Sequence, residues 1–345
     1  MNLFSLSIAF LVTLISIMLL RPVAKKLRLV DTPGGRKAHA KETPLIGGLG
    51  IYLGLATGIF LSPDVMAQYQ VLLWLAGLLL VTGLVDDYYP LPPLVRLGIQ
   101  ILAAWMMCTE GDNQLISLGH LFSEKELYLG RFSMVVTIFA SVGVINAINM
   151  IDGMDGLSSG LVLICLSFLG MAASISGSNP ALLSLALLVS ASLFAFLLLN
   201  FRAPIKKPAL IYLGDSGSTM LGFVLAWLLI ESSQRTSGQI IPATIALWFI
   251  AIPLMDSVFL LVARPLMGKS PFEPGTDHLH HLLELHGISR ANVVLLLYGA
   301  GIVLGGAGLV LFKVPAMEKM SVYFFLGVFT LHVVLMRLEK STFSK

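Results

Sequence analysis

Residues 144–160 read VINAINMIDGMDGLSSG, and this stretch carries polar residues that are hard to place in an otherwise apolar chain. The polar residues recur at three-residue spacing, at Asn146, Asn149, Asp152 and Asp155. This spacing puts them on one face of a continuing helix. Carboxylates beside long hydrophobic runs are costly unless they are paired, hydrated or bound to a cation. A glycine follows each aspartate, so we expect the helix to open here for a ligand. A solvated polar helix end is the alternative interpretation.

Composition places this stretch in a membrane protein. Of 345 residues, 57% are hydrophobic and 12% are charged, a charged fraction about half that of soluble domains. Hydrophobic runs near the length that crosses a bilayer cover residues 3–20, 45–61, 69–85, 97–110, 132–150, 157–176, 181–199, 217–231, 240–262, 293–312 and 320–336. We therefore predict an all-α integral membrane protein with about eleven transmembrane helices, folded as one unit over residues 1–345. The first run lacks a basic leader and a cleavage site, so we expect it to be retained.

The distribution of basic residues predicts the orientation of the chain. With the N-terminus outside, the inside segments carry seventeen of the 22 Lys and Arg, and the outside segments carry only Lys125, Arg131, Arg235, Lys313 and Lys319. Lys and Arg are retained on the cytoplasmic side. We therefore predict an inner-membrane protein with its N-terminus outside, its C-terminus in the cytoplasm and its polar clusters facing the cytoplasm.

Further aspartates lie at the ends of the runs or within them. Asp86 and Asp87 are adjacent, so they need a nearby cation, or else one pKa rises until the group can act as a base near neutrality. The prolines that follow cannot form regular helix, and we expect Arg96 to open the next one. Asp215, in GDSGS, could bind a metal while the helix N-terminus accepts a phosphate, or could be a simple N-cap. Asp256 lies in an apolar run and needs either a polar partner on a neighbouring helix or an inward-facing site.

Two inside loops carry the remaining candidates. Lys37 and His39 lie among prolines and glycines, in a basic loop suited to hold a phosphate headgroup at the membrane surface. The alternative interpretation is that the basic residues of this loop only mark the cytoplasmic side of the membrane. The loop 264–292 contains HLHH, with His278, His280 and His281, a spacing that suggests metal or phosphate chemistry. A solvated loop is the alternative. Zinc is a poor fit because no cysteine is available, and the oxygen-rich neighbouring sites favour magnesium or manganese.

Taken together, the segments resemble the polyprenyl-phosphate N-acetylhexosamine-1-phosphate transferases. The resemblance spans essentially the whole chain and rests on RKAH at 36–39, DD at 86–87, NAINMIDGMDGL at 146–157, GDSGS at 214–218, PLMD at 253–256 and HLHH at 278–281. The HLHH form is more similar to the branch that uses UDP-GlcNAc and undecaprenyl phosphate than to the phospho-MurNAc-pentapeptide translocases.

The resemblance implies transfer of a sugar 1-phosphate from a UDP-sugar to a polyprenyl phosphate, with UMP released and magnesium required. By position, Asp215 and Asn149 look like magnesium ligands, and Asp87 with Asp86 like the base or orienting group for the lipid phosphate. The remaining assignments place Asp152 and Asp155 near the nucleotide, the three histidines at the sugar phosphate, and Lys37, His39, Arg96, Asn146, Asp256 and Arg264 in substrate binding. Arg96 is the candidate substitute for a lysine that the translocase branch has after its aspartate pair.

Several alternatives stay open from the sequence alone. We expect a single in-line displacement by the lipid phosphate, while a two-step route through an aspartyl intermediate is the competing mechanism. The sugar could be GalNAc or MurNAc-pentapeptide, and a lipid-sugar transporter is the competing class. We expect no nucleic-acid partner. The last two runs carry no chemical pattern and are expected to serve packing, dimer or lipid contacts.

Overall fold

The computed structural model describes residues 3–31, 42–121, 125–202, 207–234, 238–268, 270, 275, 277–314 and 317–343. Its helices are α1 (Leu3–Lys26), α2 (Gly47–Phe60), α3 (Pro63–Tyr88), α4 (Pro93–Thr109), the 3-10 turn η1 (Gly130–Phe132), α5 (Ser133–Ile151), α6 (Leu157–Ser176), α7 (Pro180–Asn200), α8 (Gly214–Ser233), α9 (Ala243–Phe249), α10 (Ala251–Leu266), α11 (Leu279–Leu285), α12 (Arg290–Phe312) and α13 (Glu318–Phe343). The sheet found in these ranges pairs β1 (Val30–Asp31) with β2 (Thr43–Pro44), antiparallel. The predicted all-α membrane fold is confirmed.

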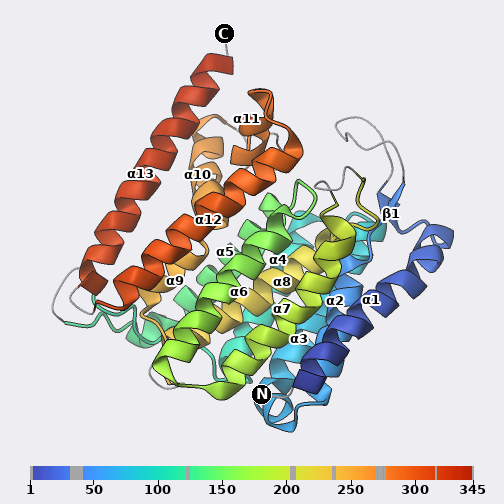
Figure 1. Ribbon diagram of the computed structural model, residues 1–345. Coiled ribbons are helices and arrows are strands. Elements are labelled where there is room, and N and C mark those ends of the chain that lie inside the picture. Colours follow the sequence, from blue (N-terminus) through green and yellow to red (C-terminus); the bar gives the residue numbers. More distant parts are fainter. Residues whose placement is uncertain are drawn as a thin grey trace.

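The predicted hydrophobic runs all fall on helices. Within the described ranges, seven helices are long and apolar enough to cross a membrane, and an eighth span is possible if the bent pair α9 and α10 counts as one. The apolar helices α2 and α4 are shorter, and α8 carries the run at 217–231. Eleven spans therefore stay a prediction, as does the orientation. The N- and C-termini lie at opposite ends of the molecule (Figure 1).

Helix α8 is the centre of the bundle. Nearly all of its residues from Ser216 onward are buried, and it packs most extensively against α3 and α5, with α2 also in contact. The helices approach closely at the start of α8, where a Cβ added to Gly48 would lie 2.4 Å from Cα of Gly217. This contact brings the GDSGS turn against the start of α2.

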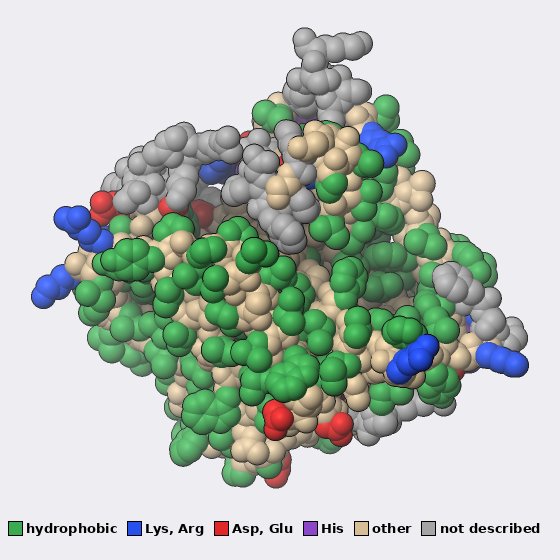
Figure 2. Space-filling model, turned by 180° about the vertical axis from the view of Figure 1, so that it is seen from behind, with side chains coloured by type: hydrophobic (Ala, Val, Ile, Leu, Met, Phe, Trp, Pro, Cys, Tyr) green, Lys and Arg blue, Asp and Glu red, His purple; other side chains and the backbone are tan. Residues whose placement is uncertain are grey.

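The outer surface of the bundle is apolar, as a lipid-facing surface must be. Large side chains such as Phe60, Trp74 and Phe139 are each 74% exposed. Figure 2 shows hydrophobic side chains over the broad middle of one face, with charged side chains mostly toward its edges. A soluble chain rarely exposes so much contiguous apolar surface. The exposed apolar surface and the spanning helices together fit a multi-pass membrane protein.

Two helix boundaries differ from expectation. The run 240–262 was expected to be one helix, but it breaks at Ile250 with a bend of 91°. Pro253 explains the break, because a proline ring clashes with the carbonyl four residues earlier, and that residue is Phe249, the last of α9. Helix α4 begins at Pro93, before Arg96, because proline is well tolerated in a first helical turn.

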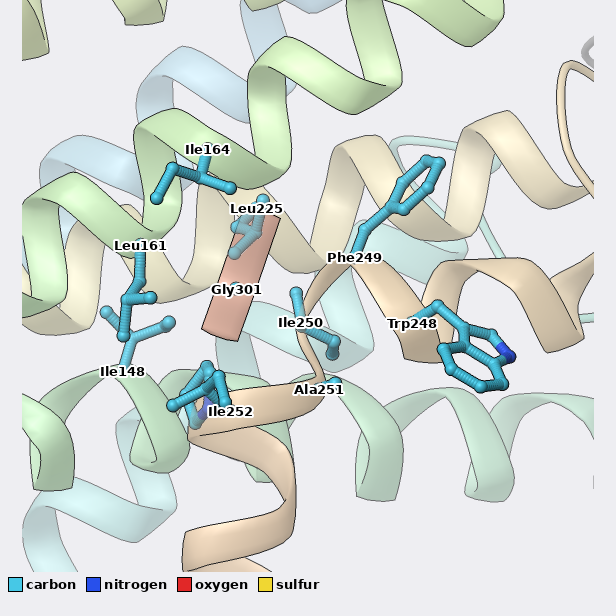
Figure 3. A pocket seen from close by; sticks show the side chains of 11 residues that line it. Ile148, Leu161, Ile164, Leu225, Trp248, Phe249, Ile250, Ala251, Ile252 and Gly301 are labelled. Carbon is cyan, nitrogen blue, oxygen red and sulfur yellow. The ribbon is translucent and has the colours of Figure 1, made fainter. Parts of the chain in front are cut away.

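The break lines an apolar cavity between α5, α6, α8 and α12 (Figure 3). The cavity holds about 10 Å³, room for no more than about one water molecule. Its walls include Ile148, Leu225, Trp248 and Ile252. An apolar space of this size is expected to stay dry, so it offers no substrate site.

Candidate functional site

The helix opens at the DGMDG loop, as the glycines predicted. Helix α5 ends at Ile151, and α6 begins after Gly156, whose φ of +82° suits glycine best. Two side chains from distant helices clamp this loop. Asn200 accepts a hydrogen bond from the Gly156 amide at 2.6 Å, and the Tyr298 hydroxyl donates to the Gly156 carbonyl at 2.5 Å. The loop is therefore held in a defined position by side chains of α7 and α12.

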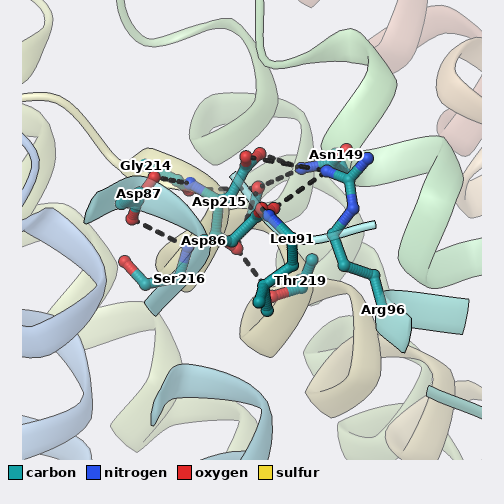
Figure 4. A network of polar contacts seen from close by, with 10 residues as sticks. Asp86, Asp87, Leu91, Arg96, Asn149, Gly214, Asp215, Ser216 and Thr219 are labelled. Carbon is teal, nitrogen blue, oxygen red and sulfur yellow. Dashed lines mark hydrogen bonds and ion pairs between the residues drawn. The ribbon is translucent and has the colours of Figure 1, made fainter. Parts of the chain in front are cut away.

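Asp87 caps the N-terminus of α8. Its carboxylate accepts hydrogen bonds from the backbone amides of Asp215 (2.8 Å) and Ser216 (3.2 Å), as Figure 4 shows. Helix α3 can come this close because Gly83 has no side chain: a Cβ there would lie 2.3 Å from Cα of Ser216. The free amides and dipole of a helix N-terminus favour an anion, so α8 holds Asp87 firmly in place.

Asp86 is fixed by two other donors. Its carboxylate accepts from the Leu91 amide at 2.7 Å and from the Arg96 guanidinium at 2.9 Å. The same guanidinium nitrogen lies 4.0 Å from a carboxylate oxygen of Asp215. Arg96 thus sits between carboxylates of α3 and α8 and offsets part of their charge (Figure 4).

The two asparagines of α5 face different helices. The Asn149 amide nitrogen donates to Asp215 at 2.7 Å and to the Ser218 hydroxyl at 2.9 Å. Its amide oxygen accepts no hydrogen bond from the described residues and can serve as a ligand. Asn146 donates instead to Gln100 on α4, at 2.7 Å. Asn149 therefore joins the carboxylates, while Asn146 ties α5 to α4.

Asp152 completes a cluster of negative charge. It accepts a hydrogen bond from Ser158 at 2.5 Å. Burial raises the pKa of Asp152 to about 7; the Ser158 bond opposes this shift, and the charges of Asp215, Asp87 and Asp155 add to it. Carboxylates from α3, α8 and the DGMDG loop thus act on one another across one site.

The histidines form a second cluster beside this loop. Asp256, buried in α10, accepts from Nδ1 of His278 at 2.8 Å and from the Leu279 amide at 2.9 Å. His280 packs against the loop, because a Cβ on Gly153 would lie 2.4 Å from its Nε2. Burial, with the charges of His281 and His278, lowers the pKa of His280 to about 3. This imidazole is therefore neutral at physiological pH.

The other predicted residues are placed less centrally. His281 is partly buried, and burial lowers its pKa; its ring centroid lies 4.2 Å from that of His280. The Arg264 guanidinium is buried and donates twice to Asp277, at 2.6 and 3.2 Å. Arg264 therefore anchors the segment that leads to the histidines. Lys37 and His39 lie outside the described residues.

Several residues that hold the site have no motif of their own. They are Gln100, Asn200, Asp277 and Tyr298, and they are joined by Ser158 and Ser218 from within the stretches 144–160 and 214–218. Asn200 is the most informative, because it bonds the Gly156 amide with its oxygen and the Ile211 carbonyl with its nitrogen. The available signal was an amide side chain directly after the largely apolar run 181–199. That signal is weak, because many helices end in asparagine.

Comparison with known proteins assigns the chain to a family. The model of glycosyl transferase family 4 matches residues 69–233, which include the acidic cluster. Three relatives carry the same name, undecaprenyl-phosphate alpha-N-acetylglucosaminyl 1-phosphate transferase. The protein of Yersinia pestis is 35% identical over 302 residues, 87% of this chain and 82% of its own length. That of Salmonella typhi is 36% identical over 299 residues (87% and 81%), and that of Haemophilus influenzae 34% over 294 (85% and 82%). The chain belongs to the family of undecaprenyl-phosphate alpha-N-acetylglucosaminyl 1-phosphate transferases.

Proposed function

We propose that this protein transfers GlcNAc 1-phosphate from UDP-GlcNAc to undecaprenyl phosphate and releases UMP. The relatives' names suggest this reaction. The observation that carries it is the convergence of Asp87, Asn149 and Asp215, from three helices, at the N-terminus of α8. These residues are far apart in the chain but meet at a helix N-terminus, whose free amides and dipole favour the binding of phosphate.

The acidic cluster fits a magnesium ion. Mg²⁺ prefers oxygen ligands and usually takes only one or two carboxylates, leaving places for substrate phosphates. Asp215 and Asn149 would hold it, because their side chains lie side by side. The Asp215 carboxylate and the Asn149 amide oxygen are ligands of the kind that Mg²⁺ prefers. An ion bound there supplies positive charge to the diphosphate. Mn²⁺ has similar ligand preferences.

The chain's own groups orient the reacting phosphates. Both carboxylates of the aspartate pair are already bonded, Asp86 to Arg96 and Asp87 to the α8 amides. Groups held this way are suited to positioning, which supports direct attack by the lipid phosphate on the β-phosphorus. Asp152, with its pKa raised to about 7 by burial, can accept the last proton of a lipid phosphate monoanion near neutral pH. Arg96 offsets charge that develops on the phosphates.

We infer that the site opens to the cytoplasm. The basic residues of the segments beside it support this orientation, because Lys and Arg are retained on that side. The site also lies at helix ends, where a water-soluble sugar nucleotide and a lipid headgroup can both reach it. A transporter would instead place polar groups at a helix break near the bilayer midplane. Here the described lining of the break at Ile250 is apolar.

Product analysis with a panel of sugar nucleotides tests the proposal. Purified full-length protein in detergent receives undecaprenyl phosphate, Mg²⁺ and one of UDP-GlcNAc, UDP-GalNAc or UDP-MurNAc-pentapeptide. We expect UMP and a lipid-linked sugar from UDP-GlcNAc, with loss of both in Asp215→Asn and retention in Glu110→Gln, an exposed carboxylate at the far end of α4. A product from another UDP-sugar alone would overturn the substrate assignment. UMP or a labelled enzyme formed without lipid acceptor would overturn direct attack.

A further inference from the structure

One cluster of metal-ligating side chains stands apart from the acidic site. It consists of Asp256 on α10, His278 just before α11 and His280 on α11. Their ligand atoms all lie within 4.8 Å of one another, and the three residues are 1%, 6% and 1% exposed. We propose that these three residues bind one zinc ion. This proposal does not depend on the transferase reaction.

His280 supplies the second, independent observation. Both of its ring nitrogens are buried, and neither has a hydrogen-bond partner among the described residues. Its ring stacks on that of His278, with centroids 5.4 Å apart and an interplanar angle of 19°. A buried polar group without a partner is costly, and a leucine would fill the same space without that cost. A metal ion gives the imidazole a reason to be there.

The donor set matches zinc better than magnesium. Two imidazoles and one carboxylate form a ligand set of zinc sites that keep a fourth position for water. Imidazole suits zinc and other first-row transition metals, whereas magnesium takes oxygen. From the sequence, zinc was disfavoured by the lack of cysteine and by the oxygen-rich neighbouring sites. This set needs no cysteine, and two of its three donors are imidazoles. The Leu279 amide bonded to the other oxygen of Asp256 orients the carboxylate, as the surroundings of metal ligands commonly do.

The ion would clip together two parts of the chain. Asp256 belongs to a long helix, while the histidines belong to the short helix α11 and the residue before it. His280 also packs against Gly153 in the DGMDG loop. Zinc bound here would therefore fix the histidine segment to α10 and against the loop that carries Asp152. Its role would be to position this segment.

Metal analysis of the purified full-length protein tests the proposal. The protein is stripped with chelator, equilibrated with Zn²⁺ alone, desalted into excess Mg²⁺ and measured by mass spectrometry of the metals. We expect one zinc per chain that Mg²⁺ does not displace, and loss of that zinc in His280→Ala and Asp256→Asn. His286→Ala, a histidine outside the cluster, and Asp215→Asn in the acidic site should both retain it. X-ray absorption at the zinc edge should show nitrogen and oxygen neighbours.

The zinc content of the wild-type protein alone can refute the inference, so the test does not depend on whether the variants fold. Less than a tenth of a zinc per chain after equilibration would overturn it, leaving Asp256 and His278 as a hydrogen-bonded pair. Zinc retained in His280→Ala, or lost in Asp215→Asn, would place the ion elsewhere and overturn it as well. None of these results depends on UMP release, so failure of the transferase assay would be a separate finding.

Discussion

The substitution Gly83→Ala tests how closely α3 must approach α8. The added Cβ would lie 2.3 Å from Cα and 2.4 Å from the backbone nitrogen of Ser216, where ordinary contact begins at 3.4 Å. Both atoms belong to backbone, so no side chain can rotate away, and the helices must separate by about 1 Å. Overpacking of this kind costs about 1–3 kcal/mol of stability. A displacement of about 1 Å in a catalytic site lowers activity about 100-fold.

The expected loss of transition-state stabilisation, about 2.7 kcal/mol for a 100-fold change, is therefore of the same size as the expected loss of folding stability. Asp87 lies one helical turn after Gly83, so any separation pulls its carboxylate from the amides of Asp215 and Ser216. The rate of UMP release, measured at varied concentrations of the lipid and of the sugar nucleotide, gives kcat/KM. A melting curve in detergent gives the stability. Gly143→Ala on α5 is the matched control, because a Cβ there meets nothing within 4 Å. That control should keep full activity and lose no stability, since alanine favours helix over glycine by about 1 kcal/mol.

Three outcomes would refute this reasoning. If Gly83→Ala keeps kcat/KM within about threefold of the parent, the contact between α3 and α8 does not set the catalytic geometry, because a displacement of about 1 Å should cost far more. If Gly143→Ala loses as much activity as Gly83→Ala, a general intolerance of alanine in these helices explains both. Stability unchanged in Gly83→Ala would contradict the expected overpacking cost of about 1–3 kcal/mol.

Charges at three other positions lead to further predictions. Burial raises the pKa of Asp152 from 3.8 to about 7, so without metal its contribution to stability is complete below about pH 4 and is lost as pH rises to about 7. Melting temperatures in chelator should show this decline, and Asp152→Asn should flatten it. Arg96→Gln removes the cation bonded to Asp86 and should lower kcat/KM about 10- to 100-fold, as for a lost hydrogen bond to a charged group; unchanged kinetics would remove Arg96 from the site. At the far end of α8, Glu231 accepts hydrogen bonds from Gln68, Tyr69, Asn179 and Trp227. Glu231→Gln should lower the free energy of unfolding by about 1–3 kcal/mol while the folded fraction keeps its kcat, and a fall in kcat alone would contradict that separation.

Hydrophobic patterning alone could predict most of the helices. Long apolar runs leave a membrane chain little choice but helix, because every backbone group must be bonded within the segment. The break at Ile250 was also within reach, since Pro253 stands four residues after the last residue of α9. Which helices pack against each other could not be predicted from the sequence. The contact of Gly83 with Ser216 joins residues far apart in the chain, and no local rule selects that partner.

The site shows the same division between local and long-range information. The sequence puts Asn146 and Asn149 on one face, yet residues three apart differ by about 60° around a helix. That angle is enough to turn one toward Gln100 on α4 and the other toward Asp215 on α8. The capping role of Asp87 was out of reach, because its amide partner lies 128 residues away. The histidine motif was visible, but its partner Asp256 was assigned separately to substrate binding.

Close packing and charge in this site have a common origin. Small residues on α2, α3 and α8 let the backbones approach, so the start of α8 meets Asp87 through its amides and needs no basic side chain there. Those amides carry only partial positive charge, and Arg96 contributes one full charge to the described cluster. Asp86, Asp87, Asp152 and Asp215 together can carry more negative charge than these donors offset. Two things can offset this excess: a proton on one of the carboxylates, such as Asp152, whose pKa is raised by burial first and by the neighbouring carboxylates second, or a cation brought by the substrate complex. Binding of a divalent ion should therefore release a proton near neutral pH. Calorimetry in buffers of different ionisation enthalpy measures this release, and a binding enthalpy that is the same in every buffer would contradict the prediction.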